Sequence, residues 1–216
     1  MTEIKKRFFT SILLFLIFFL CIYSQIALTV FLALCFYQII SEFYFILSKI
    51  FHKNKFNTYI SMLFILITLS YIIIFVWSTI LGDNNDTKLI FFLIVSVTIS
   101  SDIGGFVFGK IFKGKKLTKI SPKKTYSGMI GSYIFSFVTT YFLFKNYLNF
   151  TELMLFTIII STSSQIGDLL ISYLKRNVNI KDTSNILPGH GGLLDRFDGL
   201  ILAIPIGLIL YKFYDF

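Results

Sequence analysis

The chain is dominated by long apolar runs. Several approach or exceed the roughly 18–20 residues that an α-helix needs to cross the hydrocarbon core of a bilayer. The predicted spans are Phe8–Tyr23, Ile26–Leu47, Tyr59–Leu81, Leu89–Phe108, Met129–Phe144, Leu153–Leu174 and Leu200–Tyr214. A hydrophobic content of 56% excludes an ordinary soluble domain. The sequence therefore predicts an all-α, polytopic integral membrane protein with about seven transmembrane helices.

The basic residues divide unevenly between the two predicted sides of the membrane. Short cytoplasmic loops retain Lys and Arg, so their distribution indicates orientation. With the amino terminus in the cytoplasm, only Lys88, Lys145 and Lys212 of the 20 basic residues fall outside. This favours seven spans with the carboxyl terminus outside. The default location for such a multi-pass protein is the cell inner (cytoplasmic) membrane. Topology and attraction to membrane lipid explain the net charge of +9, so no nucleic acid partner is expected.

The longest polar segments, residues 110–127 and 175–198, both fall on the predicted cytoplasmic side. Any active site is therefore expected at the cytoplasmic face. We expect one membrane domain, with residues 1–97 forming amino-terminal transmembrane helices and residues 98–216 a catalytic region with cytoplasmic loops.

Asp102 and Asp168 each lie inside a predicted span, and such carboxylates are candidates for function because their burial in lipid is costly. Asp102 precedes the basic loop by about two turns, with Gly105 and Gly109 following it. An ion pair with a loop lysine and close helix packing are the structural alternatives for these residues. Asp168 lies in a stripe of polar residues spaced by three or four, which places them on one helix face. The stripe comprises Ser161, Ser164, Asp168, Ser172 and Lys175.

A glycine-rich loop leads into the last predicted span. Asp195 and Asp198 are three residues apart and share a helix face, with Arg196 beside them. Glycines free backbone amides to bind an anion, and carboxylates suit a hard cation, so phosphate together with Mg²⁺ is the simplest interpretation. His190 is interpreted either as a hydrogen-bonded loop residue or as a phosphate contact or proton shuttle.

Several short motifs follow one another along the chain. They are Ser172-Tyr-Leu-Lys-Arg176, Lys181-Asp182, Pro188-Gly-His-Gly-Gly192 and Asp195-Arg-Phe-Asp198, with Asp102, Ser121-Pro-Lys-Lys-Thr125 and Gly167-Asp-Leu169 upstream. In this order and spacing they resemble the signature of the phosphatidate cytidylyltransferase family. The resemblance implies that CTP and phosphatidic acid give CDP-diacylglycerol and pyrophosphate with Mg²⁺. A second metal ion and a homodimer are left open.

On this resemblance and the polar segments above, we assign three groups of site residues. The catalytic group is Lys175, Arg176, Lys181, Asp182, His190 and Arg196. The substrate-binding group is Ser121, Lys123, Lys124, Thr125, Ser172, Gly191 and Gly192. The metal group is Asp168, Asp195, Asp198 and Asp102.

Two other functions remain as alternatives at this point. A CTP-dependent polyprenol or phytol kinase would transfer the γ-phosphate to a lipid alcohol and release CDP. A small membrane transporter would use Asp102 and Asp168 as ion-coupling carboxylates. The clustering of polar residues at one membrane face, away from the midplane, argues against the transporter.

Overall fold

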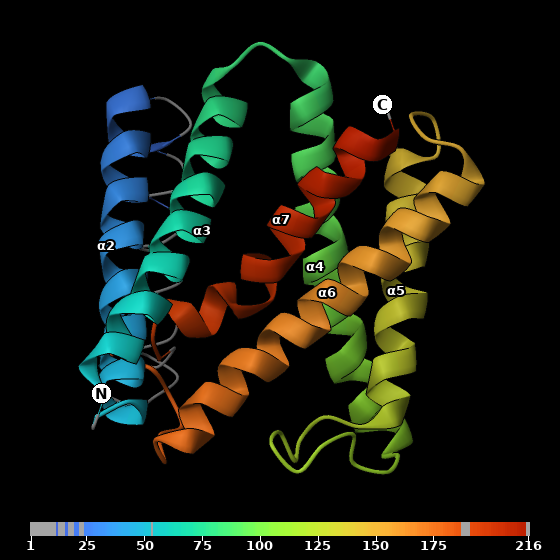
Figure 1. The fold of residues 1–216 in the computed structure, drawn as a ribbon. Helices are drawn as coiled ribbons and strands as arrows, with labels where there is room; N and C mark the ends of the chain where they lie inside the picture. The colour runs from blue at the N-terminus through green and yellow to red at the C-terminus, as the bar shows by residue number, and fades with distance from the viewer. Residues whose placement is uncertain are drawn as a thin grey trace. The chain divides into compact units, whose positions relative to one another are not determined.

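The computed structural model describes residues 24–52, 54–186 and 191–214, together with the single positions 12, 16, 20 and 21. The named helices are α2 (Gln25–Ile50), α3 (Lys55–Leu81), α4 (Asn85–Phe112), α5 (Tyr126–Phe144), α6 (Phe150–Asn177) and α7 (Leu194–Tyr214) (Figure 1). The described ranges contain no strand, and their β-type pairing consists of isolated bridge residues, among them the bridge between Lys116 and Thr125. The predicted all-α class is therefore confirmed for this part of the chain.

Five of these helices, α2 to α6, are long and apolar enough to cross a membrane. Each contains the span predicted for it, and α7 contains the last predicted span, Leu200–Tyr214. The first predicted span, Phe8–Tyr23, lies almost wholly outside the described residues. The total of seven spans and the cytoplasmic amino terminus therefore stay predictions.

Polar residues at the loop ends explain where four of the helices begin. Each side chain accepts a hydrogen bond from a backbone amide of the first turn, which otherwise has no partner within the helix. The capping residues are Ser24 for α2, Asn54 for α3, Asn84 for α4 and Thr125 for α5. Local sequence thus sets these helix starts.

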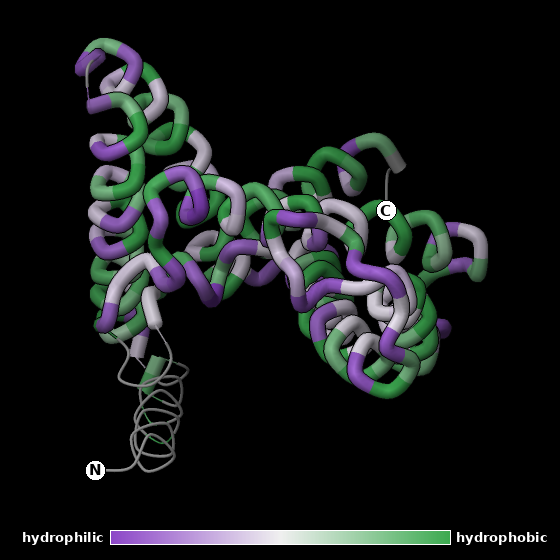
Figure 2. The backbone as a smooth tube through the Cα atoms, turned by 90° about the horizontal axis from the view of Figure 1, so that it is seen from below, coloured by the Kyte–Doolittle hydropathy of each residue, from purple (hydrophilic) through white to green (hydrophobic). Residues whose placement is uncertain are grey.

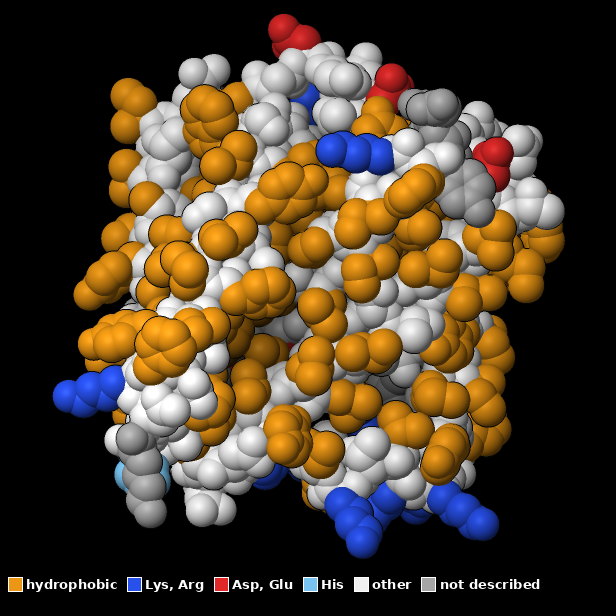
Figure 3. Space-filling model, viewed as in Figure 1, with side chains coloured by type: hydrophobic (Ala, Val, Ile, Leu, Met, Phe, Trp, Pro, Cys, Tyr) orange, Lys and Arg blue, Asp and Glu red, His pale blue; other side chains and the backbone are white. Residues whose placement is uncertain are grey.

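Large hydrophobic side chains are exposed along the helices, as expected for surfaces that face lipid. Phe64 and Ile67 on α3 and Phe142 on α5 are examples. Hydrophobic side chains cover much of the face drawn in Figure 3. Figure 2 shows hydrophobic residues recurring along the helical turns. Both views fit the prediction of a membrane protein.

The chain divides into two compact units, whose boundaries fall in the loop between α3 and α4 and inside α6 and α7. The first unit contains α2 and α3 with residues Leu174–Phe197, and the second contains residues Asn84–Tyr173 with Asp198–Phe216. In the first unit, α2 and α3 lie side by side (Figure 1). The polar segment from Leu174 to Phe197 therefore belongs with helices from the beginning of the chain.

In the second unit, α4 and α5 pack closely through glycines. A Cβ atom on Gly104 would lie 2.6 Å from the carbonyl oxygen of Gly131, and one on Gly131 would overlap the Phe108 side chain. Gly105 similarly faces Ser132 and Gly128 of α5, and Gly109 faces Gly128 and the capping residue Thr125. The structure thus supports close helix packing for these two glycines, the structural alternative expected from the sequence.

Small hydroxyl side chains link α4, α5 and α6 inside the second unit. Ser101 and Ser161 are hydrogen-bonded at 2.9 Å, and the Ser132 hydroxyl donates to the Ser101 carbonyl at 2.8 Å. Thr140 and Thr157 form a third buried link at 3.0 Å. Such pairs satisfy polar groups that lipid could not.

Candidate active site

The basic loop between α4 and α5 is ordered by backbone hydrogen bonds. The amide of Leu117 donates to the carbonyl of Lys124 at 2.8 Å, and the Lys124 amide donates to the Ser121 carbonyl at 3.1 Å. Residues Ser121 to Lys124 therefore form a turn. Thr125 ends the loop by capping α5, its Oγ1 accepting from the Gly128 amide at 3.1 Å.

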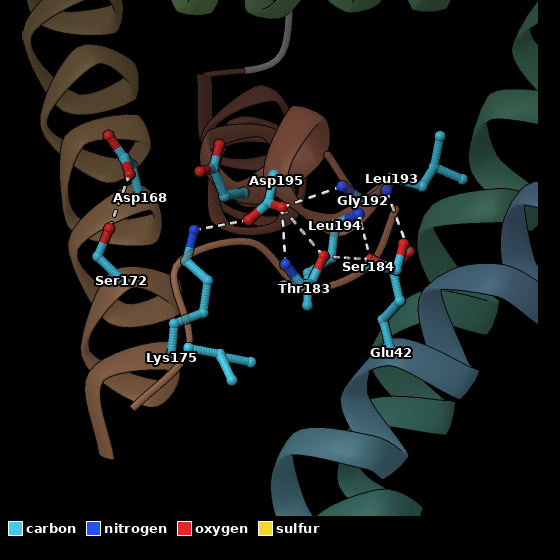
Figure 4. Close-up of polar contacts among 12 residues, drawn as sticks. Glu42, Asp168, Ser172, Lys175, Thr183, Ser184, Gly192, Leu193, Leu194 and Asp195 are labelled. Atoms are coloured by element: carbon cyan, nitrogen blue, oxygen red, sulfur yellow. Dashed lines mark hydrogen bonds and ion pairs between the residues drawn. The ribbon is translucent and has the colours of Figure 1, made fainter. Parts of the chain in front are cut away.

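This loop places the side chain of Lys124 next to Asp168 of α6. The Lys124 Nζ atom forms an ion pair with Asp168 Oδ2, and Lys123 next to it is exposed. The Ser172 hydroxyl lies one turn further along α6 and donates to Asp168 Oδ1 at 3.3 Å (Figure 4). Asp102 of α4 interacts electrostatically with both Asp168 and Lys124. The second unit thus gathers two carboxylates, a lysine and a serine, all of them predicted site residues.

A second lysine–aspartate pair lies in the first unit. Lys175 Nζ donates to Asp195 Oδ1 at 2.6 Å, and the whole Lys175 residue is only 8% exposed (Figure 4). Asp195 Oδ2 accepts from the backbone amides of Thr183 at 2.9 Å and Gly192 at 3.1 Å. Asp195 therefore joins the end of α6, the loop at residue 183 and the start of α7.

The ionisation of Asp195 follows from these contacts. Asp195 stands before the predicted span that begins at Leu200. Burial by itself would raise the pKa of Asp195, but the hydrogen bond from Lys175 and the two backbone amides bring the pKa below its ordinary value of 3.8. Hydrogen bonds to the charged form of a carboxyl favour that form. Asp195 is therefore a carboxylate at neutral pH.

Backbone conformation at Gly191 and the closeness of neighbouring side chains to Gly192 explain why the loop has glycine at these positions. Gly191 has a φ of +84°, in the left-handed region that residues with a Cβ rarely adopt. A Cβ atom on Gly192 would overlap the Thr183 hydroxyl and lie 2.6 Å from Glu42 Oε2. A side chain with a Cβ would therefore be disfavoured at both positions. Pro188 and Gly189 lie outside the described residues.

Glu42 of α2 is a functional candidate that the sequence analysis missed. Its carboxylate accepts hydrogen bonds from Thr183 Oγ1 and Ser184 Oγ, both at 2.6 Å, and from the backbone amides of Leu193 and Leu194 (Figure 4). An ionisable residue inside a predicted span was itself a signal of function. No recognisable motif surrounds Glu42, so the sequence does not indicate its partners.

The remaining predicted residues lie nearer the surface. Arg176 donates to the carbonyl of Ile180 at 3.0 Å and so closes the turn after α6. Lys181, Asp182 and Arg196 are exposed, and Asp198 accepts from the Gly199 amide at 2.9 Å. His190 lies outside the described residues.

A divalent cation would need oxygen ligands from the carboxylates of this region. Among the residues that the structure describes, no three His, Cys, Asp or Glu side chains form a metal-binding group. Mg²⁺ usually takes only one or two carboxylates and completes its shell with water and substrate phosphate oxygens. The pair Asp102 and Asp168 supplies oxygen donors of that kind, so the donor set fits an ion shared with a phosphate substrate.

Comparison with known proteins places the chain among cytidylyltransferases. The phosphatidate cytidylyltransferase of Rickettsia bellii is 42% identical over 142 residues, 61% of this chain and 60% of that protein. The enzyme of the same name from Staphylococcus haemolyticus is 38% identical over 166 residues, 73% of this chain and 62% of that protein. The matched regions thus span about three-fifths of these relatives. Because the sequence profile described as "Cytidylyltransferase family" matches residues 1–214, this chain belongs to the cytidylyltransferase family.

Proposed function

We propose that the protein is a phosphatidate cytidylyltransferase, which converts CTP and phosphatidic acid into CDP-diacylglycerol and pyrophosphate. The observation that carries the proposal is the family match over residues 1–214. The similar proteins from Rickettsia bellii and Staphylococcus haemolyticus are named phosphatidate cytidylyltransferase. The lysine–aspartate pairs support the proposal, since a reaction between two phosphates needs fixed cations.

In this reaction a phosphate oxygen of the lipid attacks the α-phosphorus of CTP. The new P–O bond forms as the bond between the α-phosphorus and the bridging oxygen breaks, and pyrophosphate leaves with that electron pair. Both reactants are anions, so their repulsion is the main obstacle. The phosphate monoester of the lipid is already nucleophilic near neutral pH, so positioning and charge neutralisation are the chief tasks of the protein.

We assign these tasks to the predicted site residues. Lys124 and Lys175 neutralise phosphate charge, and the Ser121–Thr125 loop, Ser172 and the amides of Gly191 and Gly192 position the substrates. Arg176, Lys181, Asp182, His190 and Arg196 complete the proposed catalytic group. The Lys124 and Lys175 ammonium groups now face Asp168 and Asp195, and substrate phosphates would compete with these carboxylates for them.

A divalent cation fits the same proposal. Asp102 and Asp168 would hold Mg²⁺, with Asp195 and Asp198 as the further proposed ligands. When bound, Mg²⁺ supplies positive charge to the triphosphate and to the departing pyrophosphate. The chain's own lysines orient the phosphates beside these carboxylates.

The proposed site faces the cytoplasm, where CTP is found. If each described helix crosses the membrane, the loops at residues 51–54, 113–125 and 178–193 share one side. These loops and the adjoining helix ends carry most of the basic residues, whereas Lys88 and Lys145 flank the loops of the opposite side. We therefore propose a multi-pass protein of the inner membrane with its active site inside.

Product analysis tests the proposed reaction. Purified protein with α-labelled CTP, phosphatidic acid and Mg²⁺ should form labelled CDP-lipid and one pyrophosphate for each lipid product. Release of CDP with a phosphorylated lipid alcohol would instead indicate a kinase. Asp168→Asn should raise the Mg²⁺ concentration needed for half-maximal turnover by about tenfold, because one ligand charge is lost. An unchanged Mg²⁺ requirement would remove Asp168 from the metal set.

A further inference from the structure

Glu42 is unusual because a buried carboxylate in a predicted transmembrane helix receives five hydrogen bonds. The Glu42 residue is 3% exposed. Its Oε1 accepts from Gln38 Nε2 at 2.7 Å, Ser184 Oγ at 2.6 Å and the Leu193 amide at 3.1 Å. Its Oε2 accepts from Thr183 Oγ1 at 2.6 Å and the Leu194 amide at 2.9 Å. Burial of an ionised group is tolerated only with such partners.

Two of these donors are backbone amides at the start of α7, that of its first residue, Leu194, and that of Leu193 just before it. Helix starts leave amides without intrahelical acceptors, and a polar residue just before the helix usually supplies one. The residue before α7 is Leu193, whose side chain has no acceptor. Glu42 performs the capping role from another helix, and its negative charge suits the positive end of the helix dipole.

The same contacts reach the Lys175–Asp195 pair. The backbone amide of Thr183 donates to Asp195, and the Thr183 hydroxyl lies within hydrogen-bonding distance of both Glu42, at 2.6 Å, and Asp195, at 3.2 Å. Gly192, whose amide also donates to Asp195, directly precedes the two residues whose amides bind Glu42. The Glu42 carboxylate on α2 is therefore hydrogen-bonded to both segments, 183–184 and 192–194, that supply backbone donors to Asp195.

We propose that Glu42 is a positioning residue for the active site. It holds the segments 183–184 and 192–194 together, and so sets the place of Asp195 and, through it, of Lys175. Glu42 does not touch the reacting phosphates. The expected change in CTP kinetics rests on the proposed function. The expected loosening of residues 183–194 does not, because it can be measured without substrate.

Hydrogen exchange of the purified full-length protein, followed by mass spectrometry without CTP, tests the structural part. In Glu42→Gln, peptides covering residues 183–197 should exchange about tenfold faster, because hydrogen bonds to a charged acceptor are lost. Peptides from α5 provide the internal reference. Glu152→Gln is the matched control, since Glu152 also accepts a backbone amide, that of Asn149, at the start of α6. This control should leave residues 183–197 unchanged.

Kinetics separate positioning from a general loss of folded protein. Unfolding of a fraction of the molecules lowers kcat but leaves KM unchanged. A displaced loop in every molecule should raise KM for CTP and lower kcat by about 10–100-fold, the scale expected for misplaced catalytic groups. Glu42→Asp, which keeps the charge on a shorter side chain, should recover part of the lost kcat/KM.

Several outcomes would overturn the proposal. Normal exchange at residues 183–197 in Glu42→Gln would do so, as would faster exchange with wild-type KM and kcat. If Glu42→Gln does not yield a monodisperse protein, hydrogen exchange at residues 183–197 is compared between Thr183→Val and Thr183→Ser. Only the serine variant keeps the hydroxyl that donates to Glu42. Equal exchange in those two variants contradicts the proposal. Wild-type protein without CTP turnover would refute the proposed function, while the exchange result would still decide the role of Glu42.

Discussion

Lys175 and Asp195 form a buried ion pair, with 2.6 Å between the Lys175 Nζ atom and Asp195 Oδ1. The lysine is near the end of α6 and the aspartate is the second residue of α7. Asp195 also receives two backbone amides, so the pair belongs to a hydrogen-bonded network. Breaking a buried pair on one side costs far more than replacing both partners.

Asp195→Asn should therefore abolish turnover and destabilise the protein by about 3–5 kcal/mol, because Lys175 keeps a buried charge without its partner. The double variant Lys175→Met/Asp195→Leu should recover much of the stability but none of the turnover. Thermal unfolding and CTP turnover in detergent give the two readouts. Full activity of Asp195→Asn would contradict both the metal and the pairing roles of Asp195.

The stability gained from Asp195 should depend on pH in one direction. The pKa of Asp195 in the folded protein lies below 3.8, so the stabilisation is present above about pH 4 and is lost as the pH falls through the folded pKa. The difference in melting temperature between wild type and Asp195→Asn should stay constant from about pH 7 to pH 5 and shrink below about pH 4. If the difference in melting temperature already shrank between pH 7 and pH 5, a group other than Asp195 would be responsible.

Lys124 should act on substrate phosphate through charge. Lys124→Ala is expected to raise KM for CTP by about tenfold at low salt, the loss of one charge-assisted contact. The difference in KM for CTP between this variant and wild type should become smaller as the salt concentration increases, because Lys124 is partly exposed and salt screens such charges. Lys119→Ala removes an exposed lysine of the same loop and is the control. Equal KM values for the Lys124 and Lys119 variants would leave the loop with a purely topological role.

Close packing of α4 and α5 predicts a steric effect at Gly104. Gly104→Val should lower stability by about 1–3 kcal/mol, since the added atoms meet the backbone of Gly131 and the Phe135 side chain. Ile103→Ala, one residue earlier on an exposed face, is the control and should change the melting temperature little. A Gly104 variant as stable as wild type would show that the helices can separate without cost.

Membrane orientation can be measured with single cysteines in a background without Cys21 and Cys35. A cysteine at the exposed position Asn185 should react with an impermeant thiol reagent only after the membrane is opened. One at Asp83, in the loop between α3 and α4, should react in intact cells. Labelling of residue 185 from outside would place the proposed site on the side opposite to CTP, and the proposed function would fail with it.

The helices and the motif residues could be predicted from the sequence because their signals are local. An apolar run of sufficient length and a capping side chain at its start act within a few residues, so the expected span Ile26–Leu47 appears as α2, Gln25–Ile50. The i to i+4 spacing likewise placed Asp168 and Ser172 on one face of α6, where they are hydrogen-bonded.

Tertiary structure alone decided which of these elements meet. Glu42 and Thr183 are 141 residues apart, and no periodicity relates a carboxylate on α2 to the loop before α7. The pairing of Lys124 with Asp168, and not with another aspartate, likewise depends on how the loop folds over α6. Buried charges need partners, but a partner can come from any segment that packing brings near. Sequence could therefore identify the charged groups, whereas only the packed helices determined their partners.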